Sequence, residues 1–156
     1  MRIGHGYDAH RYGENLPFVL GGVLIPSDFG MIAHSDGDVL VHALMDALLG
    51  AAGLPDIGHL FPDNDEKYKG ASSVELLREV ASLIREKGFA LEYADCTVVA
   101  QAPKLAPYID EMKKCLEEAL GVGAGRVNVK ATTEEKMGFT GALEGISSHA
   151  VCILSE

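Results

Sequence analysis

The chain has 156 residues and a mass of 16.6 kDa, which suits one domain with a buried core and is too short for two domains of ordinary size. Its 13 basic and 23 acidic residues give a formal net charge of −10, which excludes general binding along a nucleic-acid backbone. No stretch approaches the roughly 20 apolar residues that cross a bilayer. The three cysteines lack metal-ligand spacing, and their odd number indicates a reducing compartment, the cytoplasm. We expect a single domain over residues 1–156, with neither membrane nor nucleic acid as a partner.

The first third of the chain predicts a strand, a hairpin and a helix. Residues 2–8 alternate with a period of two, as in a short strand. Residues 18–20 and 23–25 flank a Gly-Gly pair, which is typical of a two-residue hairpin turn. Residues 38–52 are apolar on nearly every side of a helix, so we expect this helix to be buried. A long polar loop follows it.

The rest of the chain alternates helices and strands. A second helix is expected to begin at Ser72, where Glu75 completes a capping box, and to end at Gly88. A third helix has Pro107 in its first turn and ends at Gly121. The predicted strands cover residues 89–100, 126–131 and 146–154, and a glycine-rich loop covers 132–145. This order predicts an α/β sandwich in which helices cover one face of a mixed sheet.

Three side chains near the N-terminus form a candidate metal site. Asp8 and His10 are two residues apart in an extended segment, so their side chains leave the same face. His42 lies on the apolar helix, where an imidazole without a partner is costly. Two histidines and one carboxylate are the ligands of a catalytic zinc site with an open fourth position. The alternative is a core histidine bonded to Asp46, with Asp8 and His10 only closing a turn.

The segment before the apolar helix is a candidate phosphate site. Free N–H groups at a helix start favour an anion, and His34 could add a donor there. Alternatively, Ser35 or Asp36 only caps the helix. The string from Gly4 to Ala9 fits a dinucleotide fingerprint, but no helix follows it, so that interpretation is rejected.

Two charged residues follow predicted strand ends, where α/β proteins usually bind ligands. Lys104 suits a phosphate group, and Glu135 is a hard oxygen ligand suited to Mg²⁺ or Mn²⁺. Each of them alone also fits a solvated loop. Phe139 lies in the glycine-rich loop and either packs on the domain or meets a partner.

These motifs occur in one order along the whole chain. They are Gly4-x-Gly6-x-Asp8-x-His10, His34-Ser35-Asp36-Gly37-Asp38 with His42 and Asp46, Asp56-Ile57-Gly58, Phe61-Pro62-Asp63, Pro103-Lys104, Thr132-Thr133-x-Glu135-Lys136, Gly138-Phe139-Thr140-Gly141 and Glu144-Gly145. In this order and spacing, the chain closely resembles the 2-C-methyl-D-erythritol 2,4-cyclodiphosphate synthase family of the non-mevalonate isoprenoid pathway.

The resemblance implies an α/β subunit of ferredoxin-like character that forms a homotrimer with active sites between neighbouring subunits. It implies one Zn²⁺ per chain on Asp8, His10 and His42, and a second divalent ion, Mg²⁺ or Mn²⁺, on Glu135. The substrate-binding residues that it implies are Asp8, His10, His34, Ser35, Asp56, Gly58, Phe61, Asp63, Asp65, Ala100, Ala102, Pro103, Lys104, Leu105, Thr132, Thr133, Glu135 and Phe139.

The implied activity is that of a phosphorus–oxygen lyase. The 2-phosphate of 4-diphosphocytidyl-2-C-methyl-D-erythritol 2-phosphate attacks its own β-phosphorus, closes a ring and expels CMP. The nucleophile is already an anion, so positioning and charge neutralisation suffice, and His34 and Thr133 are implied as catalytic donors. The rival interpretations are a zinc-dependent phosphohydrolase of small molecules and a non-catalytic module that binds nucleotides or diphosphates. Many family members carry a basic residue where Ala142 stands, so we expect weak isoprenoid-diphosphate binding in the central cavity of a trimer.

Overall fold

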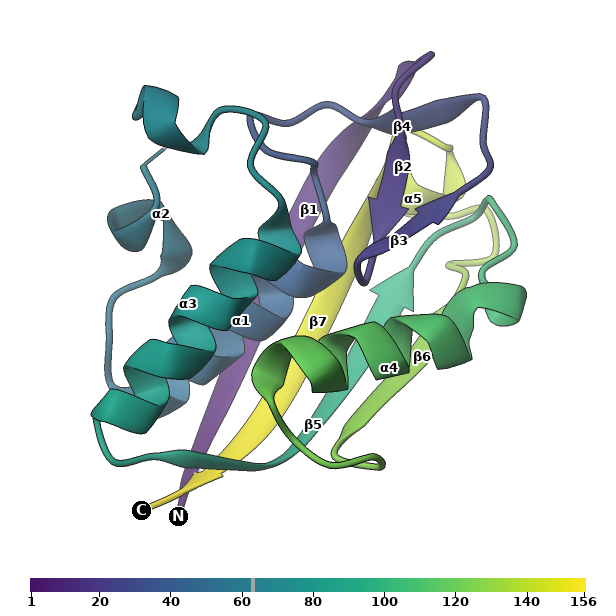
Figure 1. Ribbon diagram of the computed structural model, residues 1–156. Coiled ribbons are helices and arrows are strands. Elements are labelled where there is room, and N and C mark those ends of the chain that lie inside the picture. Colours follow the sequence, from purple (N-terminus) through teal and green to yellow (C-terminus); the bar gives the residue numbers. More distant parts are fainter. Residues whose placement is uncertain (63) are drawn as a thin grey trace.

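The computed structural model describes residues 1–62 and 64–156 (Figure 1). Its strands are β1 (Arg2–Glu14), β2 (Phe18–Leu20), β3 (Val23–Ile25), β4 (Phe29–Met31), β5 (Ala90–Val99), β6 (Val127–Thr132) and β7 (Gly145–Ser155). Its α-helices are α1 (Val39–Ala52), α2 (Ile57–Leu60), α3 (Ser73–Glu86), α4 (Ile109–Leu120) and α5 (Gly138–Gly141). Short 3₁₀ turns lie at Glu66–Tyr68 and Ala106–Tyr108.

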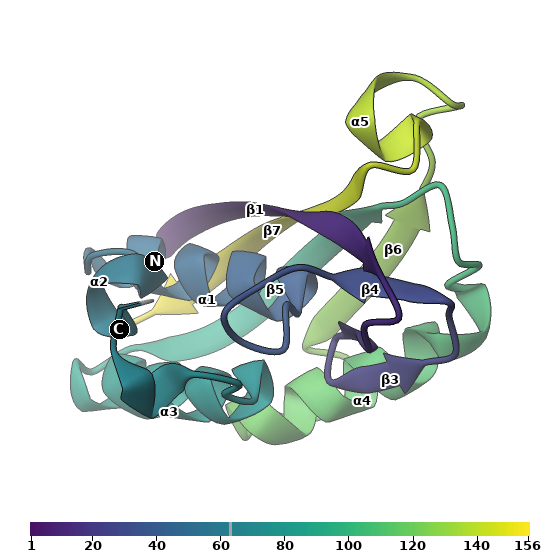
Figure 2. The same cartoon turned by 90° about the horizontal axis from the view of Figure 1, so that it is seen from above.

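Five strands form one mixed sheet in the order β4-β1-β7-β5-β6, and β2 pairs with β3 in a separate hairpin. Only β5 and β6 run parallel within the five-stranded sheet, and its other neighbours are antiparallel. The helices α1, α3 and α4 lie on one face of this sheet (Figure 2). The predicted α/β sandwich, with helices on one face of a mixed sheet, is therefore confirmed.

The two ends of the chain lie side by side. Strands β1 and β7 pair from Arg2 opposite Leu154 to Arg11 opposite Gly145. Arg2 Nε also lies 3.3 Å from Glu156 Oε1, and both ends meet at one corner of the molecule (Figure 1). The central pair of strands thus joins the first and last segments of the sequence.

Helix α1 is enclosed on all sides. It packs on β1 and β7 with one face and on α3 with another, so its apolar residues have almost no exposed surface. Asp38 caps this helix, because its Oδ1 accepts a hydrogen bond from Val41 N at 3.1 Å. The same carboxylate accepts from Gly21 N and Gly22 N at 2.9 and 2.7 Å, which fastens the β2–β3 turn to the helix start. The alternative that placed the cap at Ser35 or Asp36 is wrong.

Two glycines of β1 allow α1 to approach the sheet closely. A Cβ atom built on Gly6 would lie 1.9 Å from the carbonyl oxygen of Ala43, and one on Gly4 would lie 1.9 Å from that of Ala47. Both glycines share a strand face with Asp8, because their positions differ by multiples of two. The spacing of the two glycines therefore serves the packing of α1 on β1. This agrees with the rejection of a dinucleotide-binding fingerprint at these residues.

The structure corrects several boundaries. Strand β1 continues to Glu14 rather than ending near residue 8, and the strand β4 and the helices α2 and α5 were not predicted. Ser72 caps α3 as expected, but its side chain makes no capping hydrogen bond, so the capping box does not form. The short elements depend on contacts distant in sequence, such as the pairing of Tyr12 with Met31. No helix in residues 1–62 and 64–156 has the length and apolar character that a membrane crossing requires.

Candidate functional site

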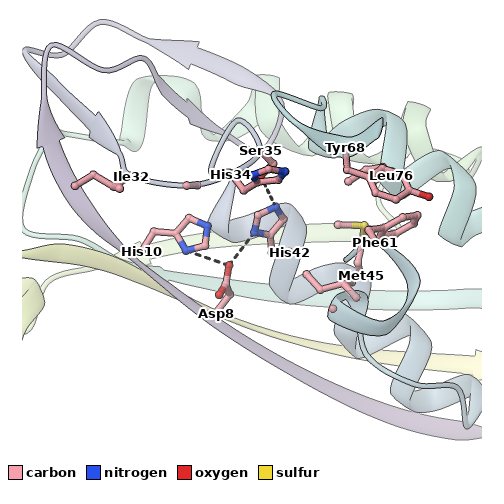
Figure 3. Close-up of a pocket in the computed structure, with 13 residues that line it drawn as sticks. Asp8, His10, Ile32, His34, Ser35, His42, Met45, Phe61, Tyr68 and Leu76 are labelled. Carbon is pink, nitrogen blue, oxygen red and sulfur yellow. Dashed lines mark hydrogen bonds and ion pairs between the residues drawn. The ribbon is translucent and has the colours of Figure 1, made fainter. Parts of the chain in front are cut away.

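Asp8, His10 and His42 come together between β1 and α1. Asp8 and His10 lie on the face of β1 that is turned toward α1, and the first turns of α1 carry His42 to them (Figure 3). His42 Nδ1 is 2.9 Å from Asp8 Oδ2, and His10 Nδ1 is 3.5 Å from the same oxygen. One ligand atom from each residue lies within 4.8 Å of the others. The predicted constellation is therefore present, and its spacing suits a shared metal ion.

Asp46 is not the partner of His42. Its Oδ1 accepts a hydrogen bond from Ile57 N at 2.9 Å, at the start of α2. The interpretation of His42 as a core histidine bonded to Asp46 is therefore wrong. Asp46 instead holds α2 against the end of α1.

The charge around His42 favours a cation. Burial lowers the pKa of His42, but the hydrogen bond and the charge of Asp8, together with Asp38 and Asp36, outweigh burial and raise it above its usual value of 6.5. The His42 side chain is only 11% exposed, so these interactions are weakly screened. Two imidazoles and one carboxylate in this setting are a donor set that fits zinc.

A cavity of about 350 Å³ opens beside the triad. His34 and Ser35 line it from the segment before α1 (Figure 3). Ile57, Gly58 and Phe61 line it from α2 and its end. His34 Nε2 is buried and has no hydrogen-bond partner among the residues that the structure describes. Such a nitrogen is costly unless a ligand pairs with it. His34 is thus a lining residue of this cavity whose Nε2 lacks a hydrogen-bond partner among the described residues.

The α2 segment forms the outer wall of this cavity. Asp56 caps α2 and accepts from His59 Nδ1 at 2.8 Å, and this hydrogen bond lowers the pKa of Asp56. Both side chains are exposed. Asp65 lies further along and accepts from Lys67 N at 3.0 Å, so it caps its own turn. The expected site residue Asp63 lies outside the described residues.

A second pocket of about 430 Å³ lies where β5 and β6 end and α4 begins. Its lining includes the expected residues Ala100, Pro103, Lys104, Leu105, Thr132 and Thr133. The expected residue Ala102 is held from β1, because Tyr12 Oη donates to its carbonyl oxygen at 3.0 Å. Burial raises the pKa of the Tyr12 hydroxyl well above its usual value, so it stays a donor. The location at strand ends agrees with the prediction from the sequence.

The remaining expected residues, Glu135 and Phe139, do not line the triad cavity, although Phe139 shares a small pocket with His10. Glu135 is exposed in the loop after β6 and has a positive φ of 52°. Phe139 is 41% exposed and borders a small third pocket with Arg11 and Glu144. Within one chain, the described residues thus form a triad cavity and a separate strand-end pocket.

The model of the YgbB family matches residues 1–155 of this chain. The chain belongs to the YgbB family. A relative from Ectopseudomonas mendocina (strain ymp), named 2-C-methyl-D-erythritol 2,4-cyclodiphosphate synthase, is 61% identical over 154 residues, which are 99% of this chain and 98% of the relative. The resemblance that the motifs indicated is therefore confirmed.

Solved YgbB-type structures show the same fold. A structure of 2C-methyl-D-erythritol-2,4-cyclodiphosphate synthase in a CDP-bound form has a TM-score of 0.91 and 40% identity, with 99% of this chain and 100% of that chain covered. The bifunctional IspDF from Campylobacter jejuni has a TM-score of 0.95 and 48% identity, with 98% of this chain but only 42% of that chain covered.

Sequence reasoning missed two residues that hydrogen-bond to expected site residues: Tyr12, which bonds to Ala102, and Ser73, which bonds to His42. Tyr12 carries no motif, and its role depends on a partner 90 positions away. Ser73 follows the predicted helix start at Ser72 and was not singled out, yet its hydroxyl lies 2.9 Å from His42 Nε2. Neither contact can be predicted from the spacing of residues along the sequence.

Proposed function

We propose that this protein catalyses the cyclisation of 4-diphosphocytidyl-2-C-methyl-D-erythritol 2-phosphate to 2-C-methyl-D-erythritol 2,4-cyclodiphosphate in isoprenoid biosynthesis, with release of CMP as a phosphorus–oxygen lyase does. The observation that carries this proposal is the convergence of Asp8, His10 and His42 at a cavity in a chain that matches the YgbB family from residue 1 to 155. The CDP bound to a relative supports a substrate that contains a nucleoside diphosphate. The free thiols of Cys96, Cys115 and Cys152 suit the cytoplasm.

One Zn²⁺ per chain would be held by Asp8, His10 and His42, whose donor atoms suit tetrahedral coordination with an open fourth position. Bound there, the ion would act as a Lewis acid on a phosphate oxygen. Glu135 offers a hard carboxylate oxygen for a second ion, Mg²⁺ or Mn²⁺.

The side chains of this chain orient the substrate and offset its charge. His34 and Ser35 line the cavity, and a phosphate oxygen would supply the partner that the buried His34 Nε2 lacks among the described residues. Gly58 lines the same cavity and Asp56 caps the helix beside it, where both suit the hydroxyls of the methylerythritol unit. Since the attacking phosphate is already an anion, no residue has to remove a proton from it.

The cytidine end of the substrate fits the strand-end pocket. Lys104 supplies a positive charge for the diphosphate and Thr133 a hydroxyl donor. Because this pocket and the triad cavity are separate in one chain, a composite site between neighbouring copies would join them. The open face of the sheet carries Ile3, Tyr7 and Val151 with 73%, 48% and 43% of their surface exposed. We infer that a homotrimer covers this face.

Phosphorus NMR of the reaction product tests this function. A cyclodiphosphate synthase gives a cyclic product and CMP, a phosphohydrolase gives an open-chain product, and a binding module gives no product. His42→Ala is expected to remove both bound zinc and activity. His5→Gln is the matched control for zinc content, because His5 points to the face of β1 opposite Asp8 and contacts His149 there. Full zinc occupancy in His42→Ala would contradict the assignment of the metal site.

A further inference from the structure

A chain of hydrogen bonds lies behind His42, on the side away from Asp8. His42 Nε2 is 2.9 Å from Ser73 Oγ, and this hydroxyl also bonds to Asp36 Oδ1. Asp36 is held in turn by two backbone donors: Ser73 N lies 2.9 Å from its Oδ2 and Asp38 N lies 3.2 Å from its Oδ1. The first residue of α3 thereby connects the loop before α1 to the imidazole of His42.

The direction of these bonds decides which nitrogen of His42 carries hydrogen. A carboxylate only accepts hydrogen bonds, and a serine hydroxyl has a single hydrogen to donate. The hydrogen of Ser73 therefore goes to Asp36, so Ser73 Oγ can only accept from His42. His42 must then carry a hydrogen on Nε2. In the structure Nδ1 also carries a hydrogen, which it donates to Asp8 Oδ2 at 2.9 Å. Because Nε2 is committed to Ser73, Nδ1 is the nitrogen whose hydrogen a metal ion would replace.

Ser35 does not decide the tautomer. Its Oγ lies 3.3 Å from His42 Nε2 and accepts from Gly37 N at 3.2 Å, so its own hydrogen remains available in either direction. Ser73 is nearer, is completely buried and has its hydrogen committed to a carboxylate. The orientation of the His42 ring thus depends on Ser73 more than on Ser35.

We propose that Ser73, held by Asp36, is the positioning residue that fixes His42 as the Nε2–H tautomer and directs Nδ1 to the metal. This inference rests on the proposed zinc site and adds to it a residue of α3. Partners that hydrogen-bond to a metal-binding histidine commonly change metal affinity 10- to 100-fold when they are removed. We expect a loss of roughly that size in Ser73→Ala.

Competition with a chelator measures the zinc affinity without any substrate. Ser73→Ala is expected to bind zinc 10- to 100-fold more weakly, and Ser73→Thr, which keeps a hydroxyl, is expected to recover most of the affinity. Ser72→Ala is the matched control, because the neighbouring Ser72 is exposed and its side chain makes no capping hydrogen bond. Unchanged affinity in a folded Ser73→Ala would overturn the proposal.

Nitrogen NMR of the zinc-loaded wild-type protein gives a second test that requires no variant. The proposal expects the His42 imidazole to be bound through Nδ1 and protonated at Nε2, and the opposite pattern would overturn it. The proposed metal site is tested separately by His42→Ala. If His42→Ala loses zinc and Ser73→Ala does not, the positioning role alone fails; if both retain zinc, the metal site itself fails.

Discussion

The close packing of α1 on β1 predicts that Gly6→Ala damages both the fold and the proposed metal site. An added Cβ would lie 1.9 Å from Ala43 O and 2.8 Å from Ala47 N. These are backbone atoms of a buried helix, so no side chain can rotate away to make room. The helix would have to move back by about 1.5 Å to restore an ordinary contact of 3.4 Å.

The size of the effect follows from that displacement. Overpacking a core commonly lowers the free energy of unfolding by about 1–3 kcal/mol. Because the added Cβ would meet rigid backbone, we expect Gly6→Ala to lower it by about 3 kcal/mol. Metal ligands tolerate shifts of only about 0.2 Å. Because His42 moves with the helix while Asp8 stays on the strand, we expect zinc affinity to fall at least about tenfold.

Urea unfolding and zinc competition measure these two losses. The matched control is Gly50→Ala in α1, where an added Cβ meets nothing within 4 Å. This control is expected to stabilise the protein by about 0.5–1 kcal/mol, because alanine favours the helix. If the free energy of unfolding of Gly6→Ala lies within about 0.5 kcal/mol of the wild-type value, and the variant binds zinc normally, the close approach of α1 to β1 is not what brings His42 to Asp8.

Three other predictions follow from the site. Tyr12→Phe removes the hydroxyl that bonds to Ala102 O and should weaken CDP binding several-fold in calorimetry; unchanged CDP affinity would show that this bond does not shape the pocket. A mixture of His42→Ala and Lys104→Ala chains, each inactive alone, should regain activity through composite sites, whereas failure after proven subunit exchange would assign each site to one chain. Because Asp8 helps to raise the pKa of His42 above 6.5, protons compete with zinc, so its measured affinity should fall as the pH drops from about 8 to about 5.5. A flat profile would contradict this.

The long elements could be predicted from sequence because their apolar patterns are local. The expected helix over 38–52 differs from α1 by one residue at its start, since a helix that is apolar on all sides can only be buried. The strand β1 was predicted too short because residues 9–14, Ala-His-Arg-Tyr-Gly-Glu, show no alternation of apolar and polar side chains. Their strand conformation depends on pairing with β7 and β4, which are distant in sequence.

The candidate metal site was predictable in part. The spacing of Asp8 and His10 and the apolar surroundings of His42 pointed to the three side chains that the fold brings together. The contacts that support them could not be found in this way, because Ser73 lies 31 positions from His42 and reaches it only through the packing of α3 on α1. Proximity of this kind arises from the tertiary fold and leaves no trace in local sequence periodicity.

The neighbouring ends of the chain have a consequence for how this fold can be joined to others. Since Arg2 and Leu154 are paired across β1 and β7, a few added residues could close the backbone into a circle and new ends could be opened in another loop. A fused domain would leave from the same corner whichever end carries it. In the bifunctional IspDF from Campylobacter jejuni, the region that matches this chain is 42% of a longer polypeptide.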